Sequence, residues 1–210
     1  MIDWQWVTDN AAMIAELTLT HLQMVVMSLA LGTILTAFML LLSIIWPVLS
    51  GPLMSLSGIL FTIPSLALFI LLLPWTGLSV TTAVIGLTLY SLLILLRNVL
   101  AGMQTLPVDV LESARALGYT RFGRFIGIEL FLILPALFAG LRVASVTLVG
   151  LVIVTALIGQ GGLGQLMLLG FNQNFLTPIV ISLFLSLLLS LLLDLLITRV
   201  GYRLSGWTRG

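Results

Sequence analysis

Two long stretches of the chain contain no Asp, Glu, Lys or Arg: Leu22 to Leu96 and Val143 to Leu193. About 20 apolar residues cross the hydrocarbon core of a bilayer as a helix, so each stretch is long enough for more than one crossing. The whole chain is 60% hydrophobic and only 7% charged, whereas about a quarter of the residues in soluble domains are charged. The sequence therefore excludes a soluble globular fold and predicts an all-α, polytopic protein surrounded by membrane lipid.

Prolines, glycines and charged residues divide these stretches into separate helices. The first helix is closed by Pro47 and a Ser-Gly-Pro turn, the second by the segment PWTGLS, and the third by Arg97. A signal peptide is not expected, because residues 1–21 have no positively charged region. The prediction is a single transmembrane domain over residues 1–210, with a charged loop at 97–130 and about five spans at 22–46, 53–73, 79–96, 135–158 and 175–197.

The arginines predict which side of the membrane each loop faces. The chain has no Lys, and every Arg except Arg142 lies either between 97 and 129 or in the tail from 199 to 210. Five spans place these two regions on the same side, whereas four or six spans would separate them. Because cytoplasmic loops are enriched in Lys and Arg, the amino terminus is predicted outside, and the charged loop and the carboxyl terminus in the cytoplasm.

The residue pattern of the charged loop predicts two short helices joined by a glycine. Asp109 and Glu112 are expected in the first turn of one helix, where the helix dipole favours acids. Val110, Leu111, Ala114 and Leu117 recur at helical spacing. Gly118 suits the residue just after a helix end, and Thr120 can cap a second helix over 121–130.

Small residues in these two helices would let another protein backbone approach closely. They are Ala114, Ala116, Gly123 and Gly127, which we expect to be exposed. An ordinary loop with isolated helical turns is the alternative that the spacing alone leaves open.

The sequence ESARALGYTRFGRFIGIEL in this loop resembles the EAA motif of the permease subunits of ATP-binding-cassette (ABC) importers. The matching residues are Glu112, Ser113, Ala114, Gly118, Ile128 and Leu130. The resemblance implies that they form coupling helices that dock on a cytoplasmic ATPase, and that the chain has the type I ABC importer permease fold. Phe131 stands where this family usually has proline, so the second helix is expected to run on into the fourth span.

Four further segments resemble the permeases for quaternary-ammonium osmoprotectants such as glycine betaine, carnitine and choline: TIPSLALF, LYSLLILLRNVLAG, AGLRVASV and IGQGGLGQL. Methionine-uptake permeases have a similar size and glycine-rich loop, so methionine or another amino acid is the alternative substrate. The resemblance implies ATPase subunits, a second permease subunit that is identical or different, and an external substrate-binding protein. It also implies a bacterial cytoplasmic (inner) membrane, and no nucleic-acid partner.

Two residues within the predicted spans are candidates for a role in the pathway or its gating. Pro64 removes a helical hydrogen bond, so it can form a hinge or a tolerated kink. Arg142 is a charged residue within the fourth span, and a charged residue inside the membrane is by default a candidate for a functional role. Alternatively, its side chain can extend to the membrane interface or pair with an acid such as Glu129. Asp194 is expected at the interface, and His21 at the start of the first helix.

Other motifs favour structural interpretations. Ala136, Gly140 and Ala144 form a small-residue stripe that should seat one helix against another. The loop GQGGLG at 159–164 also fits the pattern G-x-G-x-x-G, but a dinucleotide site needs a preceding strand and an acid about 20 residues later. Because a transmembrane helix precedes the loop and the next acid is Asp194, we expect an irregular turn at the outer membrane face.

The sequence lacks the residue types and motifs of several common catalytic sites. With no Cys and one His, the chain lacks a cysteine nucleophile and a Cys/His zinc set. It has no G-x-x-x-x-G-K-[ST] motif either, so ATP is expected on a partner subunit. No catalytic, metal or cofactor site is therefore predicted. A non-transport membrane scaffold stays compatible with the helices but leaves the EAA-like motif unexplained.

Overall fold

The computed structural model describes residues 2–206, and every regular element in that range is helical. The longer helices are α2 (Ala11–Ile45), α3 (Ser50–Thr62), α4 (Ser65–Thr76), α5 (Val80–Gln104), α8 (Leu130–Val154), α9 (Leu163–Asn172) and α10 (Leu176–Leu204). The shorter ones are α1 (Trp4–Asp9), η1 (Pro47–Leu49), α6 (Val108–Ala116), α7 (Arg121–Arg124), the π-helical turn η2 (Phe125–Glu129) and η3 (Thr155–Ile158). The predicted all-α fold class is confirmed.

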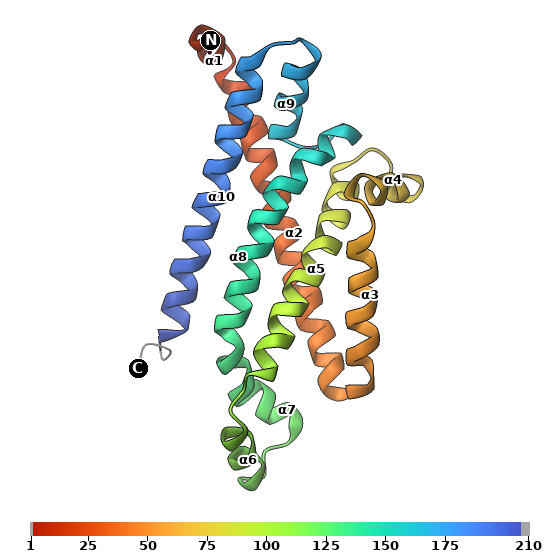
Figure 1. The fold of residues 1–210 in the computed structure, drawn as a ribbon, viewed down its shortest axis with the longest axis vertical. Coiled ribbons are helices and arrows are strands. Elements are labelled where there is room, and N and C mark those ends of the chain that lie inside the picture. Colours follow the sequence, from red (N-terminus) through yellow and green to blue (C-terminus); the bar gives the residue numbers. More distant parts are fainter. Residues whose placement is uncertain (1, 207–210) are drawn as a thin grey trace.

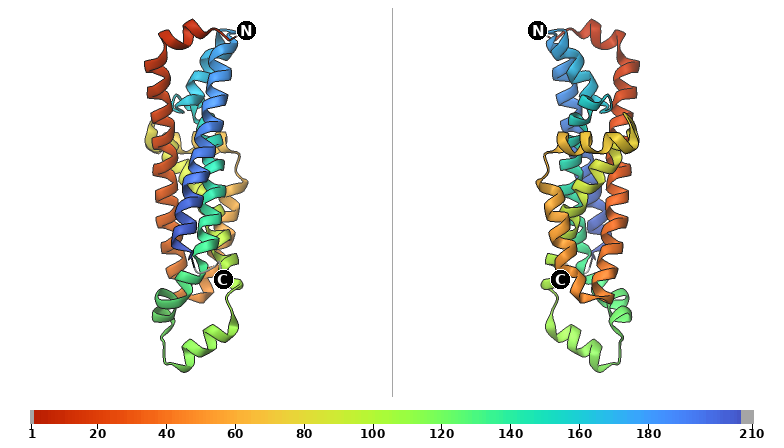
Figure 2. Two further views of the ribbon diagram at one scale, coloured as in Figure 1. Left: turned by 90° about the vertical axis from the view of Figure 1, so that its left-hand side faces the viewer. Right: turned by 90° about the vertical axis from the view of Figure 1, so that its right-hand side faces the viewer.

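Within residues 2–206, four helical segments are long and apolar enough to cross a membrane: α2, α5, the continuous helix Arg121–Ile158, and α10. A fifth candidate is the pair Pro47–Thr62 and Ser65–Thr76, which is bent by 101° at its break. The long helices run side by side along the long axis of the molecule (Figure 1), and the same elongated bundle is seen from its two sides in Figure 2. The chain is therefore a polytopic helical bundle with four or five crossings.

Several helices extend beyond the spans that hydropathy predicts. α2 begins at Ala11, so His21 lies well inside a helix and the expectation that it starts one is wrong. α5 continues past Arg97 to Gln104. A helix can continue beyond the membrane, because each added residue forms a backbone hydrogen bond whether or not lipid surrounds it. Hydropathy, by contrast, identifies only the part of a helix that lies within the membrane.

α5 lies at the centre of the bundle, where it packs against α2, α3, α4 and α8. A Cβ on Gly140 of α8 would lie 2.9 Å from the Cβ of Asn98 in α5, and a Cβ on Gly102 would lie 2.5 Å from the Cβ of Ala136. Ala144 is fully buried. The predicted small-residue stripe is thus confirmed as the surface on which α8 approaches α5 closely.

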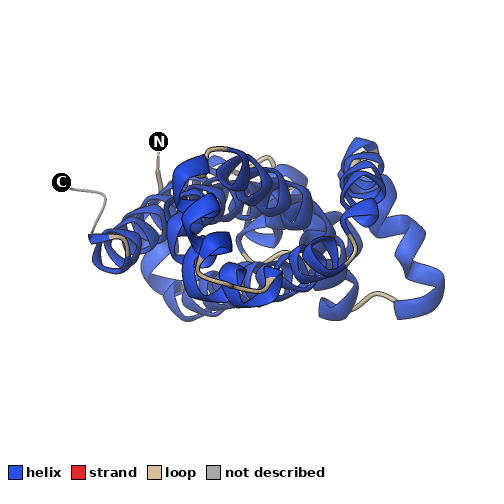
Figure 3. Cartoon of the chain, turned by 90° about the horizontal axis from the view of Figure 1, so that it is seen from below, coloured by secondary structure: helices blue, strands red, loops and turns tan. Residues whose placement is uncertain are grey.

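The two ends of the bundle differ in what they carry. The amino terminus, α1 and α9 lie at one end, and α6, α7 and the end of α10 lie at the other (Figure 1). Viewed from below, the described chain consists of helices joined by short loops (Figure 3). Arg199 and Arg203 therefore lie toward the same end as the charged loop, while Arg209, also in the predicted tail, lies outside the described residues.

Candidate functional site

The residues with the EAA-like motif project from one end of the bundle as the short helices α6 and α7 (Figures 1 and 2). We refer to residues 105–130 as the coupling segment. α6 follows Pro107 and has Asp109 in its first turn and Arg115 in its last, an arrangement that the helix dipole favours. Glu112, expected in the first turn, lies beyond it because the helix begins only at Val108.

A glycine corner joins the two helices. Gly118 has a left-handed φ of +82°, which costs glycine little because it has no Cβ. The amide of Tyr119 donates to the carbonyl of Ala114 over 3.1 Å. The hydroxyl of Thr120 accepts from the amide of Gly123 over 3.1 Å and caps α7. The predicted helix, glycine corner and helix are confirmed, and an ordinary loop is excluded.

The six motif residues differ in exposure. Three of them are exposed: Glu112, Ser113 and Gly118. Ile128 and Leu130 are half-buried, and Ala114 is only 2% exposed. The expectation that Ala114 is exposed is wrong, because the turn at Gly118 folds the chain back. Ala114 consequently shares a hollow of about 340 Å³ with Tyr119 and Ile128.

Large hydrophobic side chains other than the six motif residues are also exposed on the coupling segment, among them Val108, Leu117, Tyr119, Phe122 and Ile126. Leu117 is 78% exposed, although its helical spacing with Leu111 and Ala114 would place it on a buried face. Exposed apolar clusters rimmed by charges mark protein interaction sites. The position of Leu117 directly before the glycine corner is the signal that could have identified it.

A π-helical turn connects the coupling segment to α8. Arg124 and Glu129 form an ion pair across this turn, and Phe125 within it is buried in an apolar cluster with Leu40, Val99 and Ile133. The helix then continues without interruption to Ile158. This confirms the expectation, drawn from Phe131, that the second coupling helix runs into the fourth span.

Pro64 breaks the second predicted span. α3 ends at Thr62, α4 begins at Ser65, and the bend at this break is 101°. The hydroxyl of Tyr90 in α5 donates a hydrogen bond to the carbonyl of Ile63, a group that a helix end leaves without a partner. The break is therefore supported by a neighbouring helix and is more than a kink.

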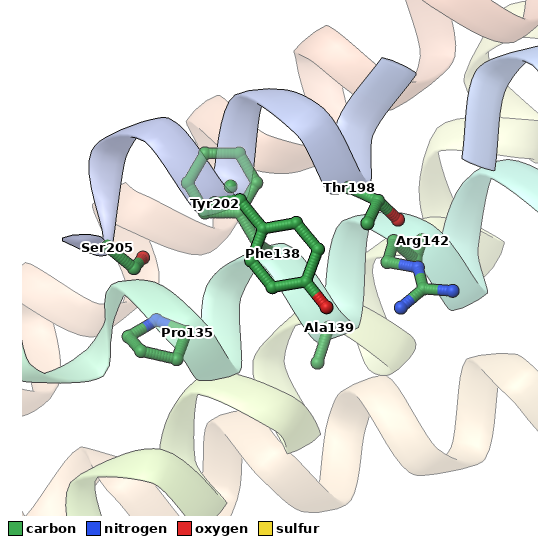
Figure 4. Close-up of a pocket in the computed structure, with 8 residues that line it drawn as sticks. Pro135, Phe138, Ala139, Arg142, Thr198, Tyr202 and Ser205 are labelled. Atoms are coloured by element: carbon green, nitrogen blue, oxygen red, sulfur yellow. The ribbon is translucent and has the colours of Figure 1, made fainter. Parts of the chain in front are cut away.

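Arg142 pairs with Asp194, and the alternative partner Glu129 is wrong because Glu129 is bound to Arg124. The Nε of Arg142 lies 2.7 Å from one carboxylate oxygen of Asp194, and its Nη2 lies 3.0 Å from the other. A hollow of about 150 Å³ opens beside this pair. Figure 4 shows residues of its wall: Phe138, Ala139 and Arg142 of α8, Thr198 and Tyr202 of α10, and Ser205 directly after α10.

The glycine-rich loop packs against α2 rather than forming a ligand cradle. Gly159, Gly161 and Gly162 all have positive φ, and a Cβ on Gly162 would lie 2.6 Å from the backbone nitrogen of His21. The ring Nε2 of His21 lies 3.1 Å from the carbonyl of Val149. The preceding element is the helical turn η3 and not a strand, so the context of a dinucleotide site is not met.

Within residues 2–206, no three His, Asp or Glu side chains gather closely enough to hold a metal ion. The described charged side chains instead include two ion pairs, Arg124 with Glu129 and Arg142 with Asp194. The arrangement suits a membrane bundle that presents a docking surface at one end.

Comparison with known protein families identifies the chain. Residues 40–206 match the family described as binding-protein-dependent transport system inner membrane component. The chain belongs to this family. It is a permease of the ABC importer type, so the family that the sequence predicted is confirmed.

Several relatives are named as permeases for osmoprotectants. The chain is 36% identical to the osmoprotectant import permease protein OsmW of Salmonella typhimurium over 172 residues, which cover 80% of each chain. It is 36% identical to the glycine betaine/carnitine/choline permease OpuCD of Bacillus subtilis over 64% of this chain and 58% of the relative. The carnitine permease OpuCD of Listeria monocytogenes is 35% identical over 64% of this chain and 60% of the relative.

Solved structures establish the fold. The MetNI methionine ABC transporter in an inward-facing form has a TM-score of 0.83 and 20% identity, covering 93% of this chain and 98% of that chain. An amino acid ABC transporter with histidines has a TM-score of 0.75 and 19% identity, covering 97% and 99%. At these identities the likeness concerns the fold alone, which is that of the type I ABC importer permeases.

Proposed function

We propose that this chain is the subunit that forms the translocation pathway of an ABC importer for a small osmoprotectant of the glycine betaine, carnitine or choline type. The observation that supports this most is the 36% identity to an osmoprotectant permease over 80% of both chains. The amino-acid alternative is supported by fold likeness at 19–20% identity, which says nothing about the solute. A scaffold without transport would leave the exposed apolar coupling segment without a role.

The coupling segment is the surface on which we place the ATPase. Its projecting helices and exposed apolar side chains suit a groove on a cytoplasmic partner. ATP then binds to that partner, and this chain carries neither cofactor nor catalytic residues. A second permease subunit, identical or different, completes the pathway, and an external binding protein delivers the solute. A Helicobacter pylori relative named as both permease and binding protein supports such a pairing.

The orientation follows from the charge at the two ends of the bundle. The end with the coupling segment also carries Arg199 and Arg203, whereas α1 and α9 contain no Lys or Arg. The positive-inside rule supports an orientation with the coupling segment in the cytoplasm and the amino terminus outside. The family, described as an inner membrane component, supports a bacterial inner membrane.

Solute-stimulated ATP hydrolysis tests the proposal. The complete complex, purified with its ATPase and reconstituted with its binding protein, is expected to hydrolyse ATP faster when glycine betaine, carnitine or choline is added. Methionine should have no effect, and omitting the binding protein is the control. Stimulation by methionine, with all three osmoprotectants inert, would assign the chain to amino-acid uptake instead.

A further inference from the structure

The pair formed by Arg142 and Asp194 places two full charges within membrane-spanning helices, on a surface that the described chain leaves open. Their side chains remain 46% and 25% exposed. Charged side chains in such helices almost always face a bundle interior or a water-filled cavity, because facing hydrocarbon is costly. We refer to the surface where α8 and α10 meet around Arg142 and Asp194 as the seam. The seam therefore faces water or protein in the assembled transporter, and not lipid.

Other polar groups continue along this seam. Thr147 of α8 lines a hollow of about 470 Å³ together with both members of the pair, and Thr198 and Tyr202 of α10 line the hollow of about 150 Å³ together with Arg142 (Figure 4). The Oγ1 atom of Thr198 is buried and has no hydrogen-bond partner within residues 2–206. By contrast, Leu192 and other exposed leucines of α10 suit a lipid environment. The seam is thus a polar strip beside an apolar surface.

The ion pair keeps binding capacity for a ligand. Arg142 donates through Nε and Nη2 to the two oxygens of Asp194, which uses two of the five N–H groups of a guanidinium. Each carboxylate oxygen of Asp194 accepts one of these bonds and has a further lone pair. A zwitterion can therefore place its carboxylate against Arg142 and its cationic end against Asp194. Arg142 also lines the hollow of about 150 Å³, where the aromatic ring of Tyr202 can attract an onium group.

We propose that the Arg142–Asp194 pair and the hollow lined by Thr198 and Tyr202 form a contact site for a zwitterionic solute during its passage through the permease. This inference rests on the proposed function and names the residues that would meet the solute. A neutral ion pair suits a transport pathway because binding must be weak enough for release. The charge of Asp194 is already balanced by Arg142, so an onium group meets no uncompensated acid.

Uptake of glycine betaine and of choline can test the contacts of Arg142 and of Asp194 separately. Both carry a quaternary ammonium, but only glycine betaine carries a carboxylate. Removing the positive charge of Arg142 in Arg142→Gln takes away a charge-assisted hydrogen bond to that carboxylate. We expect it to lower glycine betaine uptake by about tenfold relative to choline uptake. Asp194→Asn should lower the uptake of both solutes, because both present the onium group.

The experiment uses the whole complex with its ATPase and binding protein in vesicles of fixed composition. Uptake of the two solutes is compared in the same preparation, so that a lower amount of assembled protein cancels from the ratio. Arg199→Gln is the matched control: it removes the same charge from an exposed position further along α10 and should leave the ratio unchanged. Equal losses for both solutes in Arg142→Gln would make the pair purely structural and overturn the site.

A zwitterionic lipid headgroup has the same chemistry as the solute, and the vesicle composition separates the two. The uptake ratio of each variant is measured in phosphatidylethanolamine-containing vesicles and in phosphatidylglycerol vesicles. A ratio that depends on the variant but not on the lipid supports the solute site, whereas a ratio that changes only with the lipid overturns it. If the wild-type complex takes up none of glycine betaine, choline and carnitine, the proposed function itself is wrong. If it takes up choline alone, only the carboxylate contact is wrong.

Discussion

Arg124 and Glu129 form an ion pair across the π-helical turn that joins α7 to α8. Both side chains are largely buried, at 15% and 6% exposure. A π turn inserts an extra residue into a helix and occurs frequently at functional sites. Because α7 and α8 are otherwise one continuous helix, the pair helps to fix the direction in which the coupling segment leaves the bundle.

The first prediction concerns this pair. Glu129→Gln leaves the buried guanidinium of Arg124 without a counter-charge, which costs about 3–5 kcal/mol in measured cases. We expect a lower unfolding temperature in detergent and a weaker stimulation of ATP hydrolysis by loaded binding protein. Arg199→Gln, at an exposed position of α10 outside the coupling segment, is the control and should change neither. Normal stimulation in Glu129→Gln would mean that the pair plays no part in coupling.

The second prediction concerns the glycine corner. No atom lies within 4 Å of a Cβ built on Gly118, but its φ is +82°, so a side chain there meets backbone strain and no steric clash. Gly118→Val should cost about 1–2 kcal/mol and loosen the attachment of the ATPase without preventing membrane insertion. Co-purification of the two subunits measures this. Gly58→Ala, in open space on α3 at an ordinary φ, should co-purify normally, and equal yields for both variants would refute the role of the corner.

Local signals in the sequence predicted the helical bundle and the coupling segment. The absence of charge marks membrane spans, and Gly118 and Thr120 act through their own backbone conformation or a hydrogen bond three residues away. The partner of Arg142 could not be predicted in this way, because Asp194 is 52 residues further along the chain and only the packing of α10 on α8 brings it near. Ala114 was misjudged for the same reason, since its burial depends on how the chain folds back after the corner.

The third prediction concerns the break in the second span. Tyr90 is buried and its hydroxyl donates to the carbonyl of Ile63, so Tyr90→Phe leaves that carbonyl without a donor. A buried unsatisfied group costs about 1–3 kcal/mol, and the unfolding temperature of the permease in detergent should fall accordingly. Tyr119→Phe is the matched control, since Tyr119 is exposed on the coupling segment. Equal stability of the two variants would show that the break does not depend on Tyr90.

The fourth prediction separates backbone strain from steric clash in the glycine-rich loop. Gly159 and Gly162 both have positive φ, but only Gly162 lies against another helix: its Cβ would be 2.6 Å from the backbone nitrogen of His21 and the carbonyl oxygen of Leu17. Gly159→Ala should therefore cost about 1 kcal/mol, and Gly162→Ala considerably more, because backbone atoms cannot move aside. Unfolding in detergent compares them, and equal losses would mean that the loop does not pack tightly on α2.

The last prediction concerns orientation, and the absence of native cysteine makes it direct. Gln173, which follows α9, and Ala116 on the coupling segment are both exposed and lie at opposite ends of the bundle. In intact cells an impermeant thiol reagent should label Gln173→Cys but not Ala116→Cys, and after cell lysis it should label both. Ser205 near the end of α10 is 6% exposed, so a cysteine there could escape labelling from either side and does not report orientation. Labelling of Ala116→Cys before lysis would place the coupling segment outside the cell, where no ATPase could dock on it, and would reverse the orientation inferred from the arginines.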